Sequence, residues 1–246
     1  MLSEKEKIEY NILMIIRDAE GQPIGCGSIS VKLQSLGHSF SEATVGRFLR
    51  EMDFSGFTQK AGFRGRMLSG TGQDRLAELD GKERRLKCGE ELMVAVQGHT
   101  KEQLLEVLIA RRAIESELTF LAAQNASPDE IRTIKGVLAR QIAALQNGDS
   151  AAAEDVEFHN QIVHMARNRI LAAAVALIRQ DTLLSPVLER IKRHVHSLPH
   201  VVDHQKIVEN IAKGNGELAR AAMVEHINSL IGDVEKYWES IDQKCT

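Results

Sequence analysis

Four polar side chains in the C-terminal half of the chain could together bind a metal ion. Asp155 and His159 are four residues apart, so a helix places both on the same side. His204 and His226 follow in two later segments. One carboxylate and three imidazoles suit Zn²⁺, Ni²⁺, Mn²⁺ or Fe²⁺, and the absence of a thiolate argues against a soft metal. The residues therefore predict a site for one divalent ion.

Each of these side chains lies at the centre of an apolar helical face when the sequence is placed at about 100° per residue. Asp155 and His159 fall on the buried face expected for a helix over 149–167, His204 on that of a helix after Pro199, and His226 on that of a helix over 217–238. A lone histidine on such a face is more often a hydrogen-bonded core residue than a ligand. Because buried polar groups are costly without partners, three helices that each bury one favour a shared metal ion.

A second charged pair lies within an apolar face, on a helix expected over 102–123. Arg111 and Glu115 are one turn apart near the centre of this face. One interpretation is an internal ion pair at a helix contact. The other is that Arg111 binds an anion in a cavity, because a guanidinium holds a carboxylate with two hydrogen bonds. Arg111 and Glu115 are therefore the candidate effector-binding residues.

The N-terminal third has the order of elements of a winged helix-turn-helix. Apolar spacing predicts one helix around Ile8–Ile16, a second over 28–36 and a third over 42–53, with Ser41 as its N-cap. A β-hairpin is expected over 57–69, followed by a short helix over 73–79. In such a domain the third helix enters the major groove of DNA and a basic hairpin contacts phosphates.

The candidate DNA-binding residues lie on the polar side of the third helix and in the hairpin. They are Thr44, Arg47, Arg50, Lys60, Arg64 and Arg66. The formal net charge of the 246-residue chain is only −3, so contact with DNA must come from such a local basic patch. The alternative is a winged helix that makes only protein contacts.

Two known families resemble the two parts of the chain. The stretches SEATVGRFLREMDFSGF and GRMLSGTGQDRLAEL resemble the winged helices of NrpR-type regulators and of the N-terminus of ribonuclease R. The stretches RRAIESELTFLAA, DVEFHNQIVHMARNRIL and DHQKIVENIAKGNGELARAAMVEHI resemble the FadR-type C-terminal domain (FCD) of GntR-superfamily repressors. The N-terminal segment does not resemble the usual GntR winged helix, which leaves the dimer arrangement and the operator sequence open.

The FCD resemblance implies an antiparallel bundle of six or seven helices, with a metal at the floor of a cavity where small organic acids bind. It assigns Asp155, His159, His204 and His226 to the metal positions and Arg111 to the arginine position. The fold class expected for the whole chain is therefore mainly α. The expected parts are a DNA-binding domain over 1–80, a linker helix over 81–100 and an FCD-like domain over 101–240.

Composition limits the environment of the protein. The three cysteines are far apart in the sequence, which argues against a disulfide framework or a cysteine zinc site. No apolar run approaches the roughly 20 residues of a membrane span, and the N-terminus is charged. We expect a cytoplasmic protein without a membrane partner.

Together these patterns predict a transcription regulator and not an enzyme. It is expected to be a homodimer that binds a double-stranded DNA operator, a divalent metal (Zn, Ni or Mn) and a small carboxylate effector. One alternative is a metalloregulator that senses the ion itself. Another is a metal-dependent hydrolase that activates water at an open coordination position, with Glu115 as a possible base. RNA binding is disfavoured because the N-terminal segment has only a few aromatic residues for stacking on bases, and most of them fall on faces expected to be buried.

Overall fold

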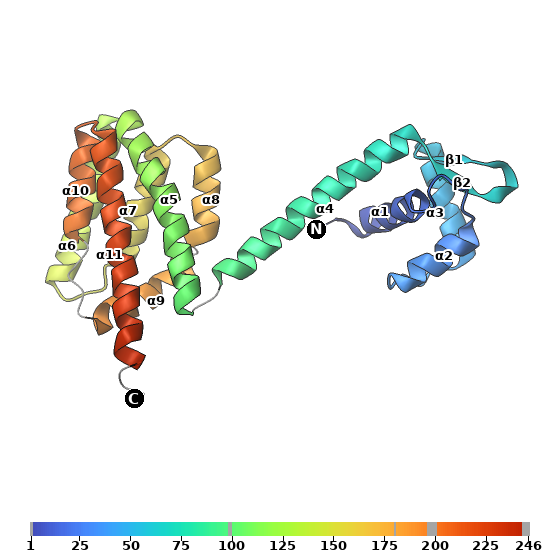
Figure 1. The fold of residues 1–246 in the computed structure, drawn as a ribbon. Helices are drawn as coiled ribbons and strands as arrows, with labels where there is room; N and C mark the ends of the chain where they lie inside the picture. The colour runs from blue at the N-terminus through green and yellow to red at the C-terminus, as the bar shows by residue number, and fades with distance from the viewer. Residues whose placement is uncertain (1, 98–99, 180, 196–200, 243–246) are drawn as a thin grey trace. The chain divides into compact units, whose positions relative to one another are not determined.

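A computed structural model describes residues 2–97, 100–179, 181–195 and 201–242 (Figure 1). The chain divides into two compact units, Met1–Glu91 and Leu92–Thr246. Each unit has its own apolar core, so each can be described by itself. The prediction of a mainly helical chain with one small sheet is confirmed.

The first unit has the predicted order of a winged helix-turn-helix. Its elements are α1 (Glu4–Arg17), α2 (Cys26–Ser35), α3 (Glu42–Phe54), β1 (Thr58–Lys60), the 3-10 turn η1 (Gly62–Arg64), β2 (Arg66–Leu68) and the first part of α4 (Gly70–Val96). The strands are antiparallel, with Thr58 opposite Leu68 and Lys60 opposite Arg66. The core that joins the three helices includes Ile12, Leu13, Ile29, Leu33, Val45 and Leu49.

The helix starts follow from local hydrogen bonding. Ser3 and Glu6 form a reciprocal capping box at the start of α1, and Ser41 caps α3 by accepting from the Thr44 backbone N–H at 3.2 Å. The cap fixes where α3 begins, and the apolar stripe of α3 then turns Val45, Leu49 and Met52 into the core. The opposite side of α3 is left for solvent or a partner.

The short helix over 73–79 and the linker helix over 81–100 were expected as separate elements, but they form one helix, α4, which runs from Gly70 to Val96. Gly81 does not break it, since polar contacts extend past this glycine. Asp80 accepts a hydrogen bond from the Tyr10 hydroxyl at 2.6 Å, and Lys82 pairs with Glu6 at 2.7 Å. These contacts tie α4 to α1 within the first unit.

The second unit contains seven helices in the part of the chain that the structure describes, in agreement with the expected bundle. They are α5 (Lys101–Asn125), α6 (Pro128–Gln146), α7 (Ala152–Met165), α8 (Arg169–Arg179), α9 (Asp181–His194), α10 (Val201–Ala212) and α11 (Gly216–Asp242). The long helices α5 and α11 share the most extensive contact, and α10 packs against α11, α6 and α5.

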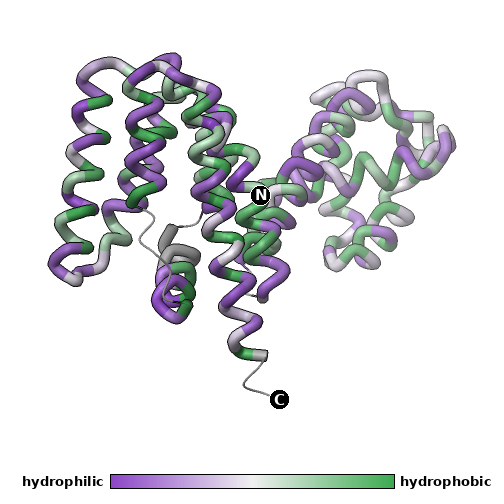
Figure 2. Tube along the Cα trace, turned by 60° about the vertical axis from the view of Figure 1, so that its left-hand side comes forward, coloured by the Kyte–Doolittle hydropathy of each residue, from purple (hydrophilic) through white to green (hydrophobic). Residues whose placement is uncertain are grey.

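Apolar and hydrophilic residues alternate along the helices of the bundle, as the hydropathy colouring in Figure 2 shows. The apolar residues form one core that draws on all seven helices, including Leu108, Ile134, Phe158, Ile207 and Met223. Among the described residues, no helix has the length and apolarity that crossing a membrane would require.

Candidate metal centre

Three buried histidines meet inside the second unit. His159 comes from α7, His204 from α10 and His226 from α11, and each supplies a ring nitrogen within 4.8 Å of those of the other two. The ring centroids are 5.5 Å apart for His159 and His204, 5.4 Å for His159 and His226, and 4.6 Å for His204 and His226. The helices thus bring together three side chains that are up to 67 residues apart in sequence, from 159 to 226.

Asp155 lies beside this cluster, one turn before His159 on α7. Its Oδ1 is 3.8 Å from His204 Nε2, and its side chain is 24% exposed. Burial raises the pKa of the Asp155 carboxyl, but the neighbouring side chains of His159 and Lys192 outweigh burial and hold this pKa far below its ordinary value. Asp155 is therefore an anionic oxygen donor next to the three imidazoles.

The surroundings of the ring nitrogens in this cluster suit the binding of a metal ion. Among the described residues, Nε2 of His159 and Nε2 of His204 have no hydrogen-bond partner although both are buried. Burial, reinforced by nearby positive charge, lowers the pKa of both imidazoles, so both are neutral near pH 7 and keep a lone pair. Unpartnered buried nitrogens beside a carboxylate are the donor set that a divalent ion would satisfy.

A buried glutamine orients His204 from the outside. Gln141 of α6 lies with its Oε1 2.8 Å from His204 Nδ1, and both side chains are buried. When the amide oxygen accepts, the proton is on Nδ1 and the lone pair is on Nε2, the nitrogen next to Asp155. Phe158 stacks on the same ring at a centroid distance of 3.9 Å. Both contacts fix the plane of His204.

Glu115 is the centre of a second buried cluster. Its Oε1 accepts from Arg111 Nε at 2.6 Å, and its Oε2 lies 3.3 Å from Arg179 Nη1 of α8. The same Oε2 is 2.6 Å from His159 Nδ1, although these two atoms are not aligned as a hydrogen bond. Burial raises the pKa of Glu115, but the Arg111 guanidinium and the neighbouring His159 side chain outweigh burial, and the pKa lies well below its ordinary value. The ion pair that the sequence allowed between Arg111 and Glu115 is therefore present.

Two buried polar residues near these clusters, Gln141 and Arg179, were not predicted from the sequence. A signal for both was available. Gln141 continues the buried spacing of Ile134, Val137 and Leu138 on α6, and Arg179 follows Val175 and Ile178 on α8. Both residues are therefore polar side chains within an apolar helical face, the same pattern that marks the three histidines.

The predicted DNA-binding residues of the first unit are placed differently from one another. Arg47 and Arg50 of α3 are exposed, as are Lys60 and Arg64 of the hairpin, whereas Thr44 is partly buried at the start of α3. Arg66 is mostly buried, and its guanidinium holds the carboxylate of Asp53 with contacts of 2.9–3.0 Å. Arg66 thus joins the hairpin to α3.

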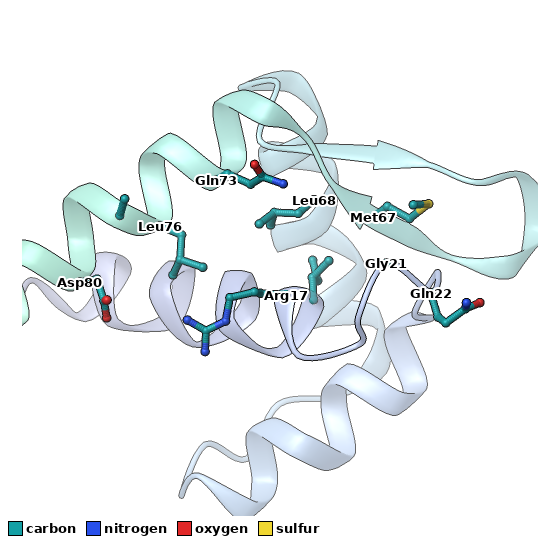
Figure 3. A pocket seen from close by; sticks show the side chains of 10 residues that line it. Arg17, Gly21, Gln22, Met67, Leu68, Gln73, Leu76 and Asp80 are labelled. Carbon is teal, nitrogen blue, oxygen red and sulfur yellow. The ribbon is translucent and has the colours of Figure 1, made fainter.

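A groove of about 460 Å³ lies in the first unit between α1, β2 and α4 (Figure 3). Its lining is mainly apolar and includes Leu68 and Leu76. The charged groups at its edge are already paired, since Asp80 accepts from Tyr10 and Arg17 contacts Asp18 at 2.9 Å. No group in this groove therefore demands a ligand.

The family of the chain is established by its C-terminal part. The sequence profile of the FCD domain matches residues 106–229, which is half of the chain, and the chain belongs to this family. The profile of the ribonuclease R winged-helix domain matches residues 10–76. The resemblances to the FCD domain and to the ribonuclease R winged helix are thus confirmed.

Curated relatives with this domain are named as regulators. The chain is 26% identical over 129 residues to the "Uxu operon regulator" of Haemophilus influenzae, covering 51% of this chain and 48% of that one. It is 24% identical over 144 residues to the "HTH-type transcriptional regulator LutR" of Bacillus subtilis, covering 56% and 65%. It is 25% identical over 135 residues to the "HTH-type transcriptional repressor NanR" of Escherichia coli, covering 54% and 51%. The chain thus spans about half to two thirds of the length of these relatives, and their names agree with a regulator and not an enzyme.

Two solved structures align along most of the chain at low identity. "E. coli McbR/YncC" has a TM-score of 0.48 at 16% identity, covering 97% of this chain and all of that one. A GntR-family regulator from Pseudomonas syringae has a TM-score of 0.48 at 14% identity, with complete coverage of both chains. Values this low add nothing to the assignment made from the sequence profiles.

Proposed function

We propose that this protein is a DNA-binding transcription regulator whose FCD domain binds one divalent metal ion and a small carboxylate effector. The observation that carries the proposal is the combination, in one chain, of a winged helix with exposed basic residues and an FCD domain with three converging buried histidines. The relatives named as operon regulators support the same function.

The surface for DNA is formed by α3 and the hairpin. Arg47 and Arg50, with Thr44 near the start of the helix, face a major groove, while Lys60 and Arg64 hold phosphates. Arg66 contributes indirectly, because its pairing with Asp53 holds the hairpin on α3. A homodimer that binds a pseudo-palindromic site is the natural arrangement, since one small winged helix makes few base contacts.

The test of this part measures binding of the full chain to duplex DNA over a series of salt concentrations. Removal of one phosphate-binding cation, as in Arg64→Ala, should lower the slope of log affinity against log salt by about one. Light scattering gives the oligomeric state under the same conditions. A monomer, or a protein with no salt-dependent duplex binding, contradicts the proposal.

The metal would be held by Asp155, His159, His204 and His226. When bound, such an ion supplies a Lewis-acidic position at which an effector oxygen can be held away from bulk water. The support is that Nε2 of His159 and Nε2 of His204 are buried without a hydrogen-bond partner among the described residues, and that His204 Nε2 lies 3.8 Å from the Asp155 carboxylate. Without a metal, burial of these nitrogens is unfavourable because nothing replaces their hydrogen bonds to water.

The test of the metal site is the metal content of the purified protein and of single alanine variants. His204→Ala and His226→Ala should each abolish stoichiometric metal. His164→Ala is the matched control, because His164 lies on the same helix as His159 but is exposed. If both cluster variants still contain about one metal ion per chain, the metal site lies elsewhere in the protein.

Arg111 would hold the carboxylate of the effector, and Arg179 lies close enough to Glu115 to assist. Because Arg111 is already paired with Glu115, the effector must share or replace this ion pair. Calorimetry of the wild type and of Arg111→Ala against hydroxy-, keto- and dicarboxylic acids tests the assignment. Undiminished binding by Arg111→Ala removes Arg111 from the effector site.

The same ion pair favours a second candidate function, a metalloregulator that senses the ion itself. With Glu115 as an internal partner, Arg111 does not require an external anion to be stable in the core. DNA binding that depends on the metal and is indifferent to every acid in the panel would select this function.

A further inference from the structure

The tip of the hairpin in the first unit presents an exposed phenylalanine. Phe63 lies in the 3-10 turn between β1 and β2, and its side chain is fully exposed. Three other phenylalanines of this unit, Phe40, Phe48 and Phe57, pack against the core. Phe63 contributes nothing to that core, and an aromatic ring in water leaves a large apolar area unburied. Its position is therefore one that a partner could use.

The stem below Phe63 is held on the domain at several points. Asp53, in the last turn of α3, accepts from the Thr58 hydroxyl at 2.6 Å and from Arg66 Nε at 3.0 Å. The backbones of Ile24 and Arg66 exchange two hydrogen bonds of 3.0 Å. Gly65 has a φ of +126°, and a Cβ there would lie 2.2 Å from the Ile24 carbonyl oxygen, so the chain can approach this closely only with glycine. The stem thus presents the tip in a preorganised position.

The charges around Phe63 identify the kind of partner. No acidic residue occurs between Asp53 and Asp74. Arg66 is neutralised by Asp53, whereas Lys60 and Arg64 are exposed and form no ion pair with other described residues. The tip therefore carries an apolar ring flanked by two cations. Its matching partner is a surface on which negatively charged phosphates flank apolar base faces. Duplex DNA has this combination.

The attachment of the hairpin decides which groove it reaches. The stem joins the C-terminal end of α3, the helix assigned to the major groove, and β1 packs against α3. A hairpin fixed beside a helix in the major groove would lie over the neighbouring phosphate backbone, with the adjacent minor groove within reach of its tip. We propose that Phe63 enters the minor groove as a wedge that partly unstacks a base step, while Lys60 and Arg64 hold the flanking phosphates. This inference rests on the proposed DNA-binding function.

The experiment uses the full chain and a duplex enriched by the wild-type protein from a random-sequence library. Phe63→Ala should weaken binding by roughly tenfold or more, the loss expected for one aromatic–base stack, and leave the salt slope unchanged. Phe63→Leu should keep most of the affinity, because leucine also serves as an apolar wedge. Val31→Ala is the control, since Val31 is an exposed apolar residue of α2 in the same domain and lies outside both α3 and the hairpin.

A direct readout of unstacking separates the wedge from a simple contact. With 2-aminopurine placed in turn at each adenine of the duplex, wild-type binding should raise fluorescence at one step, and Phe63→Ala should remove that rise. Wild-type affinity and fluorescence in Phe63→Ala would overturn the wedge and leave DNA binding intact. An equal loss in Val31→Ala, or an effect of Phe63→Ala on binding to anionic vesicles but not to DNA, would also overturn it. A wild type that binds no duplex defeats the proposed function itself.

Discussion

Replacing Gln141 by leucine tests whether this buried amide controls the metal affinity of His204. Leucine has a similar size but no acceptor for His204 Nδ1, which lies 2.8 Å from the Gln141 oxygen in a fully buried position. The ring then has no reason to keep its proton on Nδ1, and it can rotate or place the proton on Nε2. Either change removes the lone pair from the side of the cluster where Asp155 lies.

Gln141→Leu should have two separate effects, one on metal affinity and one on the free energy of unfolding. Loss of an outer partner of a ligating histidine weakens metal binding by about 10- to 100-fold, which corresponds to about 1.4–2.8 kcal/mol. Leaving one buried donor without its partner also lowers the free energy of unfolding of the metal-free protein by about 1–3 kcal/mol. The stability effect is present without metal, and the affinity effect appears only in metal titration, so the two can be measured independently.

The assay is a Zn²⁺ competition against a chromophoric chelator with the full chain, together with urea unfolding of the metal-free protein. Gln141→Glu keeps an acceptor oxygen and should retain or raise the wild-type affinity. Gln205→Leu is the matched control, because Gln205 follows His204 directly on α10 but is exposed. A folded Gln141→Leu protein that binds Zn²⁺ with wild-type affinity would refute the positioning role, even if its stability falls.

Two further predictions concern the hairpin of the first unit. Asp53→Asn should lower stability at pH 7 by about 1–3 kcal/mol, because the pair with Arg66 is only 14–21% exposed. Burial raises the pKa of Asp53, but the hydrogen bonds from Arg66 and Thr58 outweigh burial, so the pKa in the folded protein is below the ordinary value of 3.8. The stabilisation from this carboxylate is therefore complete above pH 3.8 and is lost as the pH falls through the lower folded pKa. The wild-type advantage in circular-dichroism urea unfolding should therefore shrink in acid, and a gap that is constant with pH would contradict this origin. Gly65→Ala should loosen the hairpin without changing the helical bundle, because the new Cβ would meet the Ile24 carbonyl oxygen. Circular dichroism should detect the loss of hairpin structure. The fluorescence of Trp238, the single tryptophan, should stay unchanged because this residue lies in the bundle.

The sequence alone determined the type of each domain and the residues most worth examining. The order of three helices and a hairpin defined the winged helix, because caps such as Ser41 and apolar spacing are local properties. Asp155 and His159 could be paired from their spacing, since one helical turn is a fixed distance. His204 and His226 could be placed on buried faces for the same reason.

Some features depended on contacts between residues that are far apart in the sequence. The expected separation of the 73–79 helix from the linker helix over 81–100 was wrong, because Tyr10 and Glu6 of α1 support α4 across Gly81, and no pattern within α4 reports contacts made by another helix. Arg66 was expected to bind phosphate because arginines in a basic hairpin often do. Its partner Asp53, 13 residues earlier, lies near it only after β1 and β2 pair.

The composition of the histidine cluster and its surroundings was decided only by tertiary structure. Helical periodicity states which face of a helix is buried, but it does not state what that face meets. The packing of α6, α10 and α11 places Gln141 on His204 and His204 next to His226, and the packing of α5 against α8 brings Arg179 to Glu115. These contacts join residues 22 to 64 positions apart, and only the packing of the helices fixes them.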